Sequence, residues 1–405
     1  MRRVAITGMG VISSIGNSVD EVTASLKDAR SGISVSDMFK DKGFRCQVEA
    51  RPNIDYETVL DRRTRRFMGE GAGWNYLAMT EAIEMSGLAP DEITHPMTGI
   101  IMGSGGPSTR AIVEAADKNR ATGATKKIGP TIVPKAMSST NSATLATLFK
   151  IRGINYSISS ACATSVHCIG AAAEQIMWGK QDVMFAGGGE ELDWTMANLF
   201  DAMGAMATAF NGTPATASRA YDKNRDGFVI AGGAGVIVLE ELSRARARGA
   251  TILGEVVGYY ANSDGDDMVQ LNGEGAVRCM QNALETVRQP IDYVNTHGTS
   301  TPIGDSKETA ALRDVFGSSL PPFSSTKSLT GHSLGAVGAQ ETVYGLIMMR
   351  DRFLCESAHI EELDPEFEGL PVIRERVDNA KVDCFLTNSF GFGGTNGCLV
   401  IARCE

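Results

Sequence analysis

Residues 156–170 read Tyr156-Ser-Ile-Ser-Ser-Ala-Cys162-Ala-Thr-Ser-Val-His-Cys168-Ile-Gly170, and this stretch decides the fold class. Residues 154–160 alternate β-branched or aromatic residues with serines, which predicts a strand. Residues 163–177 carry small apolar side chains at helical spacing, which predicts a helix with one buried stripe. That stripe consists of Ile169, Ala172, Ala173, Ile176 and Met177. We therefore expect Cys162 on a strand-to-helix turn, where unpaired N–H groups and the helix dipole favour a thiolate nucleophile.

Cys162 has two simpler interpretations, a small core residue or a metal ligand. Free cysteine is among the most buried residue types, so the core interpretation stays open until partner residues are found. A metal site would use His167 and Cys168 as further ligands. At about 100° per residue, His167 lies about 140° around a helix from Cys162, so these side chains diverge. We therefore expect no zinc or other metal.

The composition indicates a soluble protein of two packed units. The chain has 405 residues, of which 43% are hydrophobic, 21% charged and only 6% aromatic. Its 8 cysteines are scattered without a CxxC pair, which indicates neither a disulfide framework nor a zinc module. Reduced cysteines and a start that lacks a proper leader predict a cytoplasmic protein. No apolar run approaches the ~18 residues of a membrane span.

Charge excludes one class of partner and suggests another. A net charge of −10 argues against binding to nucleic acid. Positive charge is nevertheless concentrated in two segments, which are either solvated faces or docking sites for a small acidic partner. These segments contain Arg62, Arg63, Arg65 and Arg66, and Arg120, Lys126 and Lys127.

Apolar runs typical of strands alternate with helical patterns throughout, which predicts an α/β protein. A capping box at Ser18-Val-Asp-Glu21 predicts a helix that closes near Gly32, and residues 3–7 form the first expected strand. The other expected strands are Gly99–Met102, Val183–Ala186, Gly235–Glu240, Ile252–Tyr259, Tyr293–Thr296, Cys384–Ser389 and Cys398–Ala402.

The chain contains a weak internal repeat. Residues 99–109 and 293–302 both read as a strand followed by a Gly/Ser/Thr loop before a helix, and the loop-to-helix segment at Cys162 is echoed at residues 330–339. Duplication would place Cys162 and His332 at equivalent helix starts in one shared site. We expect two similar halves, 1–250 with the nucleophilic cysteine and 251–405 with two loop histidines.

Three motifs have misleading likenesses. Gly331-His-Ser-Leu-Gly335 matches the G-x-S-x-G elbow of α/β-hydrolases, with Ser333 as nucleophile, but a polar segment precedes it where that motif needs a buried strand. Asp222-Lys-Asn-Arg-Asp-Gly begins like a calcium loop, but Gly233 stands where a bidentate Glu is required, so a tight turn is expected. Gly391-Phe-Gly-Gly-Thr-Asn-Gly397 lacks the dinucleotide pattern and is either a hairpin turn or a loop that brings N–H groups to a reacting centre.

Two of the five histidines lie in Gly/Ser/Thr loops. They are His297, in Asn295-Thr-His-Gly-Thr-Ser-Thr301, and His332, in Lys327-Ser-Leu-Thr-Gly-His332. A cysteine at a helix start with two such histidines supplies a nucleophile and acid–base or oxyanion-stabilising partners.

In order along the chain, these pieces resemble the β-ketoacyl-acyl carrier protein synthases, the elongating condensing enzymes of fatty-acid synthesis. The resemblance covers essentially the whole chain, and the motifs around Cys162 and His332 look more like the type I enzymes than type II. Its motifs are Val4-Ala-Ile-Thr-Gly8, Ser159-Ser-Ala-Cys-Ala-Thr-Ser165, Phe185-Ala-Gly-Gly-Gly-Glu-Glu191, Asp226-Gly-Phe-Val229, Asn295-Thr-His-Gly-Thr-Ser-Thr301, Thr326-Lys-Ser-Leu-Thr-Gly-His-Ser-Leu-Gly335 and Asn388-Ser-Phe-Gly-Phe-Gly-Gly-Thr-Asn396.

The resemblance implies a thiolase-like fold, with duplicated α/β halves in a five-layer αβαβα sandwich. It also implies a homodimer in which the strand before Cys162 pairs across the two-fold axis, and an acyl carrier protein as partner. No cofactor is implied beyond the phosphopantetheine that the carrier brings. The two basic clusters, represented by Arg62, Arg63, Arg66, Lys126 and Lys127, would dock the carrier.

The same resemblance implies the roles of the site residues. Cys162 would accept the acyl chain, with His297 and His332 as its partners, and Lys327, balanced by Glu341, would set the electrostatics. The N–H groups of Cys162 and Phe392 would form an oxyanion hole. Thr299 and Thr301 would hold the phosphopantetheine arm, and Phe200 and Phe228 would line the acyl tunnel.

The implied reaction is a decarboxylative Claisen condensation of the acyl group on Cys162 with malonyl-acyl carrier protein. Alternatives are a type II synthase, a coenzyme A thiolase, the Ser333-dependent hydrolase and a non-catalytic partner subunit. A thiolase would need a second cysteine in a Cys-x-Gly motif, where this chain reads Gly-Phe-Gly-Gly. Leu271 stands where the type I pattern tends to have proline.

Overall fold

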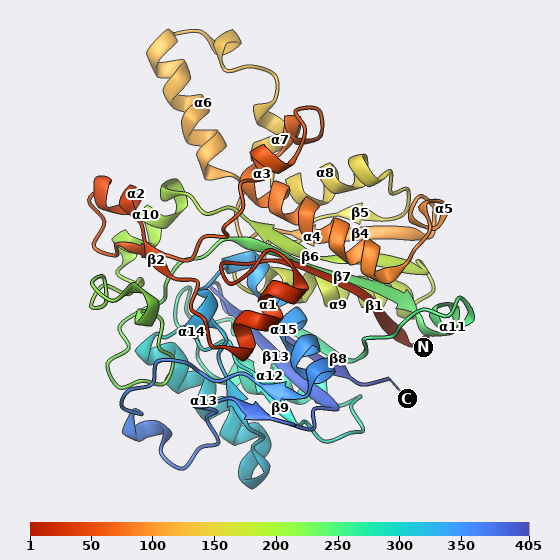
Figure 1. Cartoon of the computed structure of the whole chain (residues 1–405), viewed down its shortest axis with the longest axis vertical. Helices are drawn as coiled ribbons and strands as arrows, with labels where there is room; N and C mark the ends of the chain where they lie inside the picture. The colour runs from red at the N-terminus through yellow and green to blue at the C-terminus, as the bar shows by residue number, and fades with distance from the viewer. Residues whose placement is uncertain (405) are drawn as a thin grey trace.

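The computed structural model describes residues 1–404, and its framework is a ten-stranded mixed sheet covered by helices (Figure 1). The strands lie in the order β10-β9-β13-β14-β8-β1-β7-β6-β4-β5. They span Val4–Ile12 (β1), Thr98–Gly103 (β4), Asn155–Tyr156 (β5), Val183–Glu190 (β6), Gly233–Glu241 (β7), Gly254–Ser263 (β8), Tyr293–Asn295 (β9), Phe323–Ser324 (β10), Cys384–Gly391 (β13) and Thr395–Ala402 (β14). Two small antiparallel pairs join Ser34–Val35 (β2) to Val48–Glu49 (β3) and Phe353–Leu354 (β11) to Val377–Asp378 (β12).

The helices differ widely in length. They are Val19–Lys27 (α1), Asp37–Asp41 (α2), Tyr56–Val59 (α3), Glu70–Ser86 (α4), Pro90–Ile93 (α5), Thr109–Thr122 (α6), Ile132–Ala136 (α7), Thr140–Phe149 (α8), Thr164–Met177 (α9), Trp194–Met203 (α10), Leu242–Ala247 (α11), Glu274–Leu284 (α12), Pro302–Phe316 (α13), Lys327–Thr330 (α14) and Val337–Asp351 (α15). Short 3₁₀ turns that matter below are Thr64–Phe67 (η1), Thr125–Lys127 (η2) and Leu334–Ala336 (η5).

The sheet consists of two halves with the same topology. In the first half the order is β1-β7-β6-β4-β5, and in the second it is β8-β14-β13-β9-β10. In both halves the first two pairings are antiparallel and the last two are parallel. The halves meet where β1 pairs antiparallel with β8, from Val4 opposite Val256 to Ile6 opposite Gly254. Division of the chain into 1–250 and 251–405 stays a prediction.

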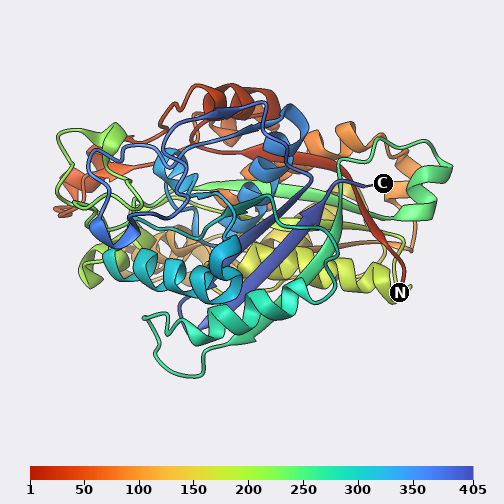
Figure 2. The ribbon, with the colours of Figure 1, turned by 90° about the horizontal axis from the view of Figure 1, so that it is seen from below.

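The helices form three layers around these two halves. In the middle layer, α9 contacts β6 and β14, α15 contacts β7 and β13, and the two helices contact each other. On one outer face α4 packs on β1 and β7, while α8 packs on β4; on the other, α12 packs on β8 and β14 and α13 on α12. Figure 2 shows this layering from below. The expected five-layer αβαβα sandwich is therefore confirmed.

Several strands differ in length from the expectation, and β1 and β5 show why. β1 extends to Ile12 because Gly8 and Gly10 do not break it: a Cβ at Gly10 would collide with the carbonyl of Ala78 in α4, so glycine allows the helix to lie directly on the strand. In contrast, the strand expected over residues 154–160 is only Asn155–Tyr156. Two of the serines that follow bond elsewhere, Ser157 to the hydroxyl of Ser142 and Ser159 to the carbonyl of Gly105, so the alternating pattern extends beyond the sheet.

The first helix begins as expected and ends early. Ser18 Oγ accepts a hydrogen bond from the N–H of Glu21, as in a capping box, but Glu21 returns to the N–H of Asn17 and not to that of Ser18. α1 ends at Lys27, before Gly32, because Ala29 adopts a left-handed conformation at φ 48°. None of the helices within residues 1–404 has the length and apolar character needed to span a bilayer.

Candidate functional site

Cys162 lies on a tight turn immediately before α9, as expected. Ala161 has φ 49°, a left-handed conformation that is uncommon for a residue with a side chain. The turn is held by the N–H of Ser160, which donates to Thr164 Oγ1 at 2.8 Å, and by the N–H of Ala163, which donates to the carbonyl of Ser160 at 3.1 Å. The predicted stripe on α9 is buried, apart from the half-buried Met177. This turn directs the Cys162 side chain into the interior.

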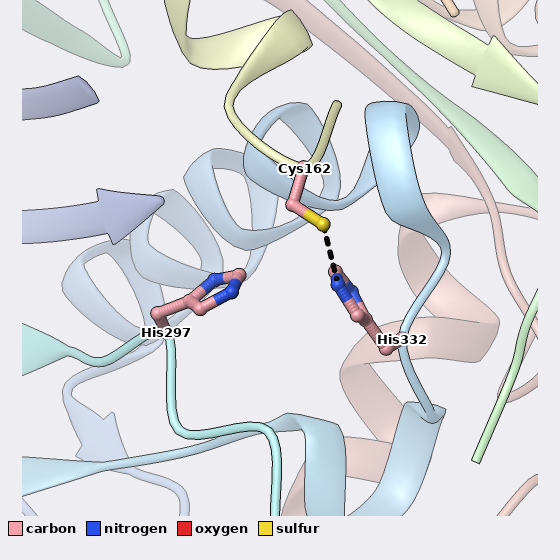
Figure 3. A group of neighbouring side chains, drawn as sticks. All are labelled: Cys162, His297 and His332. Atoms are coloured by element: carbon pink, nitrogen blue, oxygen red, sulfur yellow. Dashed lines mark hydrogen bonds between the residues drawn. The ribbon is translucent and has the colours of Figure 1, made fainter. Parts of the chain in front are cut away.

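Two histidines from the second half of the chain face Cys162 (Figure 3). His332 Nε2 lies 3.0 Å from Cys162 Sγ, and the rings of His297 and His332 are 5.2 Å apart and nearly perpendicular. The backbone of His332 is clamped to residues 229–231, since its N–H donates to the carbonyl of Val229 and its carbonyl accepts from the N–H of Ala231. The Nδ1 atoms of both histidines are buried without a hydrogen-bond partner among residues 1–404. No protein group therefore fixes either tautomer from behind.

Burial favours the neutral form of every titratable group in this cluster. It lowers the pKa of His297 and of His332 well below the ordinary value, and the charge of Lys327 lowers both further. The same burial raises the pKa of the Cys162 thiol to about 12, although Lys327 acts in the opposite direction. The expectation that the helix start favours a thiolate is therefore wrong for the resting site. The helix begins only at Thr164, and desolvation of the sulfur is the largest effect on the pKa of Cys162.

Lys327 and Glu341 form a buried ion pair. Lys327 Nζ lies 2.5 Å from Glu341 Oε1, and the two side chains are 1% and 0% exposed. Burial raises the pKa of Glu341 to about 7, against the opposing effect of Lys327. Neither residue lines the cavity in front of Cys162, and Lys327 acts on the histidines from outside that cavity.

Glu308 on α13 is a site residue that the sequence did not reveal. Its two carboxylate oxygens accept the N–H of His297 at 2.8 Å and the N–H of Gly298 at 2.7 Å, and Oε1 also lies 3.2 Å from Asn388 Nδ2. Glu308 thus holds the loop that carries His297. In sequence it is an acidic residue in a polar helix, and only the i+11 spacing from His297 offered any sign of the contact.

A cavity of about 280 Å³ opens in front of Cys162 and both histidines. Every residue predicted to act at the site, apart from Lys327 and Glu341, lies on its wall. The Thr299 and Thr301 hydroxyls are 2.9 Å apart at this wall, and the Phe200 ring packs against Phe228 at 5.4 Å and Phe392 at 6.3 Å. Residues to which no individual role was assigned from sequence also line it, namely Ala205, Asp264, Val269, Gln270, Leu271, Gly298, Ile303, Gly304, Glu308, Leu334, Phe390, Gly391 and Gly394.

Two backbone N–H groups are free at this cavity. Neither the N–H of Cys162 nor that of Phe392 donates a hydrogen bond to another residue in the part of the chain that the structure describes. The loop of Phe392 lies against the cysteine turn, because Thr395 Oγ1 donates to the carbonyl of Ser160 at 3.2 Å. This loop connects β13 to β14, so the glycine-rich segment is a hairpin turn, and Phe392 on it lines the cavity. That it brings an N–H group to the reacting centre stays a prediction.

His167 connects the same two loops from the other side. Its Nε2 lies 3.1 Å from the carbonyl of Asn396, which can only accept, so Nε2 carries the proton and Nδ1 accepts from Ser160 Oγ at 2.7 Å. His167 points away from Cys162, as the helical geometry predicts. The structural role of His167 is therefore to join the cysteine turn, through Ser160, to the start of β14, through Asn396.

The two remaining misleading motifs have structural explanations. Ser333 donates from its hydroxyl to Gln340 Oε1 at 2.5 Å, and it does not line the cavity. Asp222 accepts hydrogen bonds from the N–H groups of Asn224, Glu361 and Glu362, which makes the expected tight turn. Because the Ser333 hydroxyl is bonded to Gln340 and not to a histidine, Ser333 lacks the base that a hydrolase nucleophile needs.

The arginine cluster forms one surface hollow. Arg62, Arg63, Arg65 and Arg66 line it together with Pro130, Thr131 and Lys135, and Lys135 is a residue that the sequence did not predict there. Arg65 is paired with Glu57, whereas Arg62, Arg63 and Arg66 are exposed. Lys126 and Lys127 are exposed in η2 and do not line this hollow.

The ligand atoms of Cys162, His297 and His332 lie within 4.8 Å of one another, so the set has the donor types of a zinc site. The positive charge of Lys327 acts on all three side chains and opposes a dication. That the site holds no metal stays a prediction.

Comparisons with known proteins agree with this geometry. The model of the β-ketoacyl synthase N-terminal domain matches residues 1–245, and that of the C-terminal domain matches residues 253–361. The chain is 54% identical over 404 residues to 3-oxoacyl-[acyl-carrier-protein] synthase 1 of Escherichia coli (strain K12), covering 100% of this chain and 99% of the relative. It is 37% identical to a synthase 2 from Coxiella burnetii, covering 99% of each chain, so the greater likeness to type I is confirmed.

Solved structures match across the whole chain. A β-ketoacyl synthase from Burkholderia phymatum STM815 superposes with a TM-score of 0.93 at 34% identity, covering 100% of both chains. A type II polyketide ketosynthase in complex with its acyl-carrier protein, bound to the hexaketide, matches with a TM-score of 0.91 at 26% identity, also covering 100% of both chains.

Proposed function

We propose, because this chain belongs to the β-ketoacyl synthase family, that Cys162 carries an acyl chain as a thioester and that the enzyme extends it by two carbons. The reaction is a decarboxylative Claisen condensation with malonyl-acyl carrier protein in fatty-acid elongation. The observation that carries the residue assignment is the 3.0 Å contact between Cys162 Sγ and His332 Nε2, at the wall of a cavity that His297 also lines.

In the first half-reaction the Cys162 thiol attacks the acyl thioester of the carrier. Because the thiol pKa is about 12, its proton passes to His332 Nε2 as the sulfur attacks, and not beforehand. The C–S bond to the carrier breaks, and the carrier thiolate leaves with the proton that His332 received. The free N–H groups of Cys162 and Phe392 stabilise the tetrahedral oxyanion.

In the second half-reaction malonyl-carrier enters the same site. Its C–C bond breaks to release CO₂ and leave an enolate, whose charge the neutral His297 and His332 stabilise by donating hydrogen bonds. The enolate carbon attacks the acyl-cysteine, the C–S bond to Cys162 breaks, and the sulfur takes one proton from solvent. Two half-reactions through one covalent intermediate predict ping-pong kinetics.

The cavity wall divides into polar and aromatic parts that suit the two ends of the substrate. Thr299 and Thr301 offer hydroxyls to the phosphopantetheine arm that the carrier supplies, so no separate cofactor is needed. Phe200 and Phe228 offer an apolar surface to the acyl chain, and the Phe392 ring, which packs beside Phe200, acts as a gate to the pocket.

The acyl carrier protein docks at the exposed basic residues in this proposal. Arg62, Arg63 and Arg66 are not engaged in ion pairs within residues 1–404 and share their hollow with Lys135. Lys126 and Lys127 offer a second exposed cluster. On a chain with net charge −10, such local positive charge favours an acidic partner. The similar ketosynthase named above was solved in complex with its acyl-carrier protein, which is a precedent for binding of a carrier by this fold.

The enzyme acts as a homodimer and in the cytoplasm in this proposal. β5 is the outermost strand of the sheet next to β4, and Tyr156 on it is 41% exposed, so its free edge suits pairing with a second copy. The other edge strand, β10, is already bridged by Val372. The cysteines are free, as a reducing compartment requires. Sedimentation equilibrium tests the dimer.

Mass spectrometry tests the catalytic assignment. The protein is mixed with dodecanoyl-acyl carrier protein without a malonyl partner, and peptides are then mapped. We expect an acyl adduct on the Cys162 peptide that discharges to a longer ketoacyl-carrier when malonyl-carrier is added. Free fatty acid, or an adduct on Ser333, would show that the condensing assignment is wrong.

A further inference from the structure

Glu190 is a buried carboxyl at the end of β6 that none of the steps above uses. It is 3% exposed, and it lies between two loops from opposite halves of the chain. Its Oε2 accepts the N–H of Gly105 at 2.6 Å and the N–H of Gly335 at 2.9 Å. Its Oε1 lies 2.7 Å from Ser104 Oγ. No cation pairs with it anywhere in residues 1–404.

Ser104 has one hydroxyl hydrogen and two oxygen neighbours, and this bears on the protonation of Glu190. Ser104 Oγ also lies 2.5 Å from the carbonyl of Gly106, which can only accept, and a hydroxyl has a single hydrogen to donate. If Ser104 donates to Gly106, the proton between Ser104 and Glu190 must come from the carboxyl. Burial acts in the same direction: it raises the pKa of Glu190 to about 7, against the opposing effect of the hydrogen bonds from Ser104, Gly105 and Gly335.

The loops that Glu190 joins lead to Cys162 and His332. Gly335 comes three residues after His332, and Gly105 accepts on its carbonyl the hydroxyl of Ser159, three residues before Cys162, at 3.3 Å. The two glycines are in direct contact: a Cβ on Gly105 would lie 3.1 Å from the N–H nitrogen of Gly335 and 2.9 Å from Glu190 Oε2. One carboxyl group therefore sits where the cysteine loop and the histidine loop are joined.

We propose that Glu190 is a positioning residue that works as a neutral carboxylic acid, donating from Oε1 to Ser104 and accepting on Oε2 from Gly105 and Gly335. In this form it fixes the distance between Cys162 Sγ and His332 Nε2. The inference rests on the proposed function, because it concerns the alignment of that nucleophile with that histidine.

The neighbours of Glu190 make its ionised form unfavourable. The next carboxyl along the chain, Glu191, raises its pKa, and an ionised Glu190 would in turn raise the pKa of the Cys162 thiol. Glu70, on the packed helix α4, and Asp193, which follows β6, add negative charge to this region and act on Glu191 or are acted on by it. Arg51, which pairs with Glu70 at 2.7 Å, and Arg110 oppose that charge. Residues 104–108, which follow β4, and η5 contain no charged side chain. If Glu190 loses its proton above neutral pH while Ser104 donates to Gly106, no hydrogen remains between Ser104 Oγ and Glu190 Oε1.

The test compares Glu190→Gln with Glu191→Gln. Glutamine at 190 reproduces the proposed pattern, since its N–H₂ donates to Ser104 and its oxygen accepts both N–H groups. Glu191 instead receives only donors, Ser108 Oγ at 2.7 Å and the N–H of Arg110 at 3.2 Å, so an amide there disrupts one of them. Infrared difference spectra against wild type, recorded below and above pH 7, report the carbonyl band of a protonated carboxylic acid.

We expect E190Q to keep a condensation rate within about twofold of wild type, since both of its hydrogen-bonding roles are retained. The fall in the condensation rate of E190Q at alkaline pH should begin at a higher pH than in wild type. The difference spectrum should show loss of a protonated-carboxyl band that wild type itself loses above neutral pH, and E191Q should retain that band. Glu190→Ala should lose about 100-fold in rate, because a displacement of about 1 Å at a reacting pair has that effect.

A loss of activity in E190Q comparable to that in E190A, or the absence of the band in wild type below pH 7, would overturn the inference. The spectrum decides the protonation state even if E190A fails to fold. Acylation of Cys162 is measured in wild type from the same preparation. If it occurs as expected, either negative result counts against the Glu190 inference and not against the proposed function. If wild type forms no acyl-cysteine, the proposed function fails, and the infrared result still stands on its own.

Discussion

Replacement of Lys327 by methionine tests the electrostatics of the site. The ammonium lies 2.5 Å from Glu341 Oε1, both side chains are almost fully buried, and Glu341 Oε2 has no partner within the described residues. Removal of one member of such a pair leaves the other to be buried either as an unpaired charge or in its neutral form. Breaking a buried pair in this way costs about 3–5 kcal/mol in the free energy of unfolding. The double variant Lys327→Met/Glu341→Gln removes that charge and should recover most of the loss.

The stability loss in K327M should depend on pH. The pKa of Glu341 is about 7 with Lys327 present and rises further without it, while in the unfolded chain it has its ordinary value of 4.5. Folded Glu341 therefore keeps its proton where unfolded Glu341 releases it. Stability falls as the pH rises from about 4.5 through the folded pKa. Urea unfolding at pH 6 and pH 8 measures this: the midpoint of K327M should fall more at pH 8, and that of the double variant should not.

The pH dependence of the condensation rate distinguishes the effect of the Lys327 charge on the histidines from the contribution of Lys327 to stability. That charge lowers the pKa of His297 and His332, so both histidines in K327M are protonated more readily and the acid limb of the condensation rate moves to higher pH. The double variant should regain stability without regaining the wild-type acid limb. An unchanged urea midpoint in K327M, or an acid limb that does not move in either variant, would refute the reasoning.

Three further predictions concern single steps. Cys162→Ala should form no acyl adduct, whereas Ser333→Ala should be acylated like wild type; full condensation by the cysteine variant would exclude the assigned nucleophile. His297→Asn should accept the acyl chain at a near-normal rate but condense about 10²–10³-fold more slowly, the effect of losing one oxyanion donor; equal losses in both steps would argue against its role as an enolate donor. Charge reversal to Glu in the exposed basic cluster should raise the Kd for acyl carrier protein and flatten its salt dependence, measured by titration at several salt concentrations, and unchanged binding would exclude this surface. The residues to reverse are Arg62, Arg63 and Arg66.

Local patterns were sufficient for the elements that depend on local sequence. The turn at Cys162 follows from an apolar helix stripe directly after a β-like segment, and the confirmed strands follow from buried apolar runs. The repeat of loop-then-helix segments anticipated that Cys162 and His332 meet, because duplication brings equivalent positions together. The length of β5 could not be predicted, since its serines alternate like a strand but bond to Ser142 and Gly105, residues far away in sequence.

Properties that depend on burial and on distant partners were not predictable from sequence. A cysteine before a helix suggests a thiolate, and only the packed structure shows that desolvation raises its pKa to about 12. Glu308 and Glu190 gave no signal because their partners are backbone N–H groups, which every residue offers. Lys135 joined the arginine cluster only through the contact of α7 with η1.

The site is more easily understood from its desolvation than from any single residue. The same burial that raises the pKa of Cys162 lowers those of His297 and His332, so the resting cavity holds a thiol and two neutral imidazoles beside one fixed positive charge. At the reacting atoms, negative charge appears with the substrate, as the tetrahedral oxyanion and then as the enolate. There it meets the N–H groups and the imidazoles, and Lys327 acts on it from outside the cavity. A stable thiolate would occupy that positive field in the resting state and reduce its effect on the transition state. A neutral resting cysteine is therefore the form that leaves the electrostatics of the site available for the reaction.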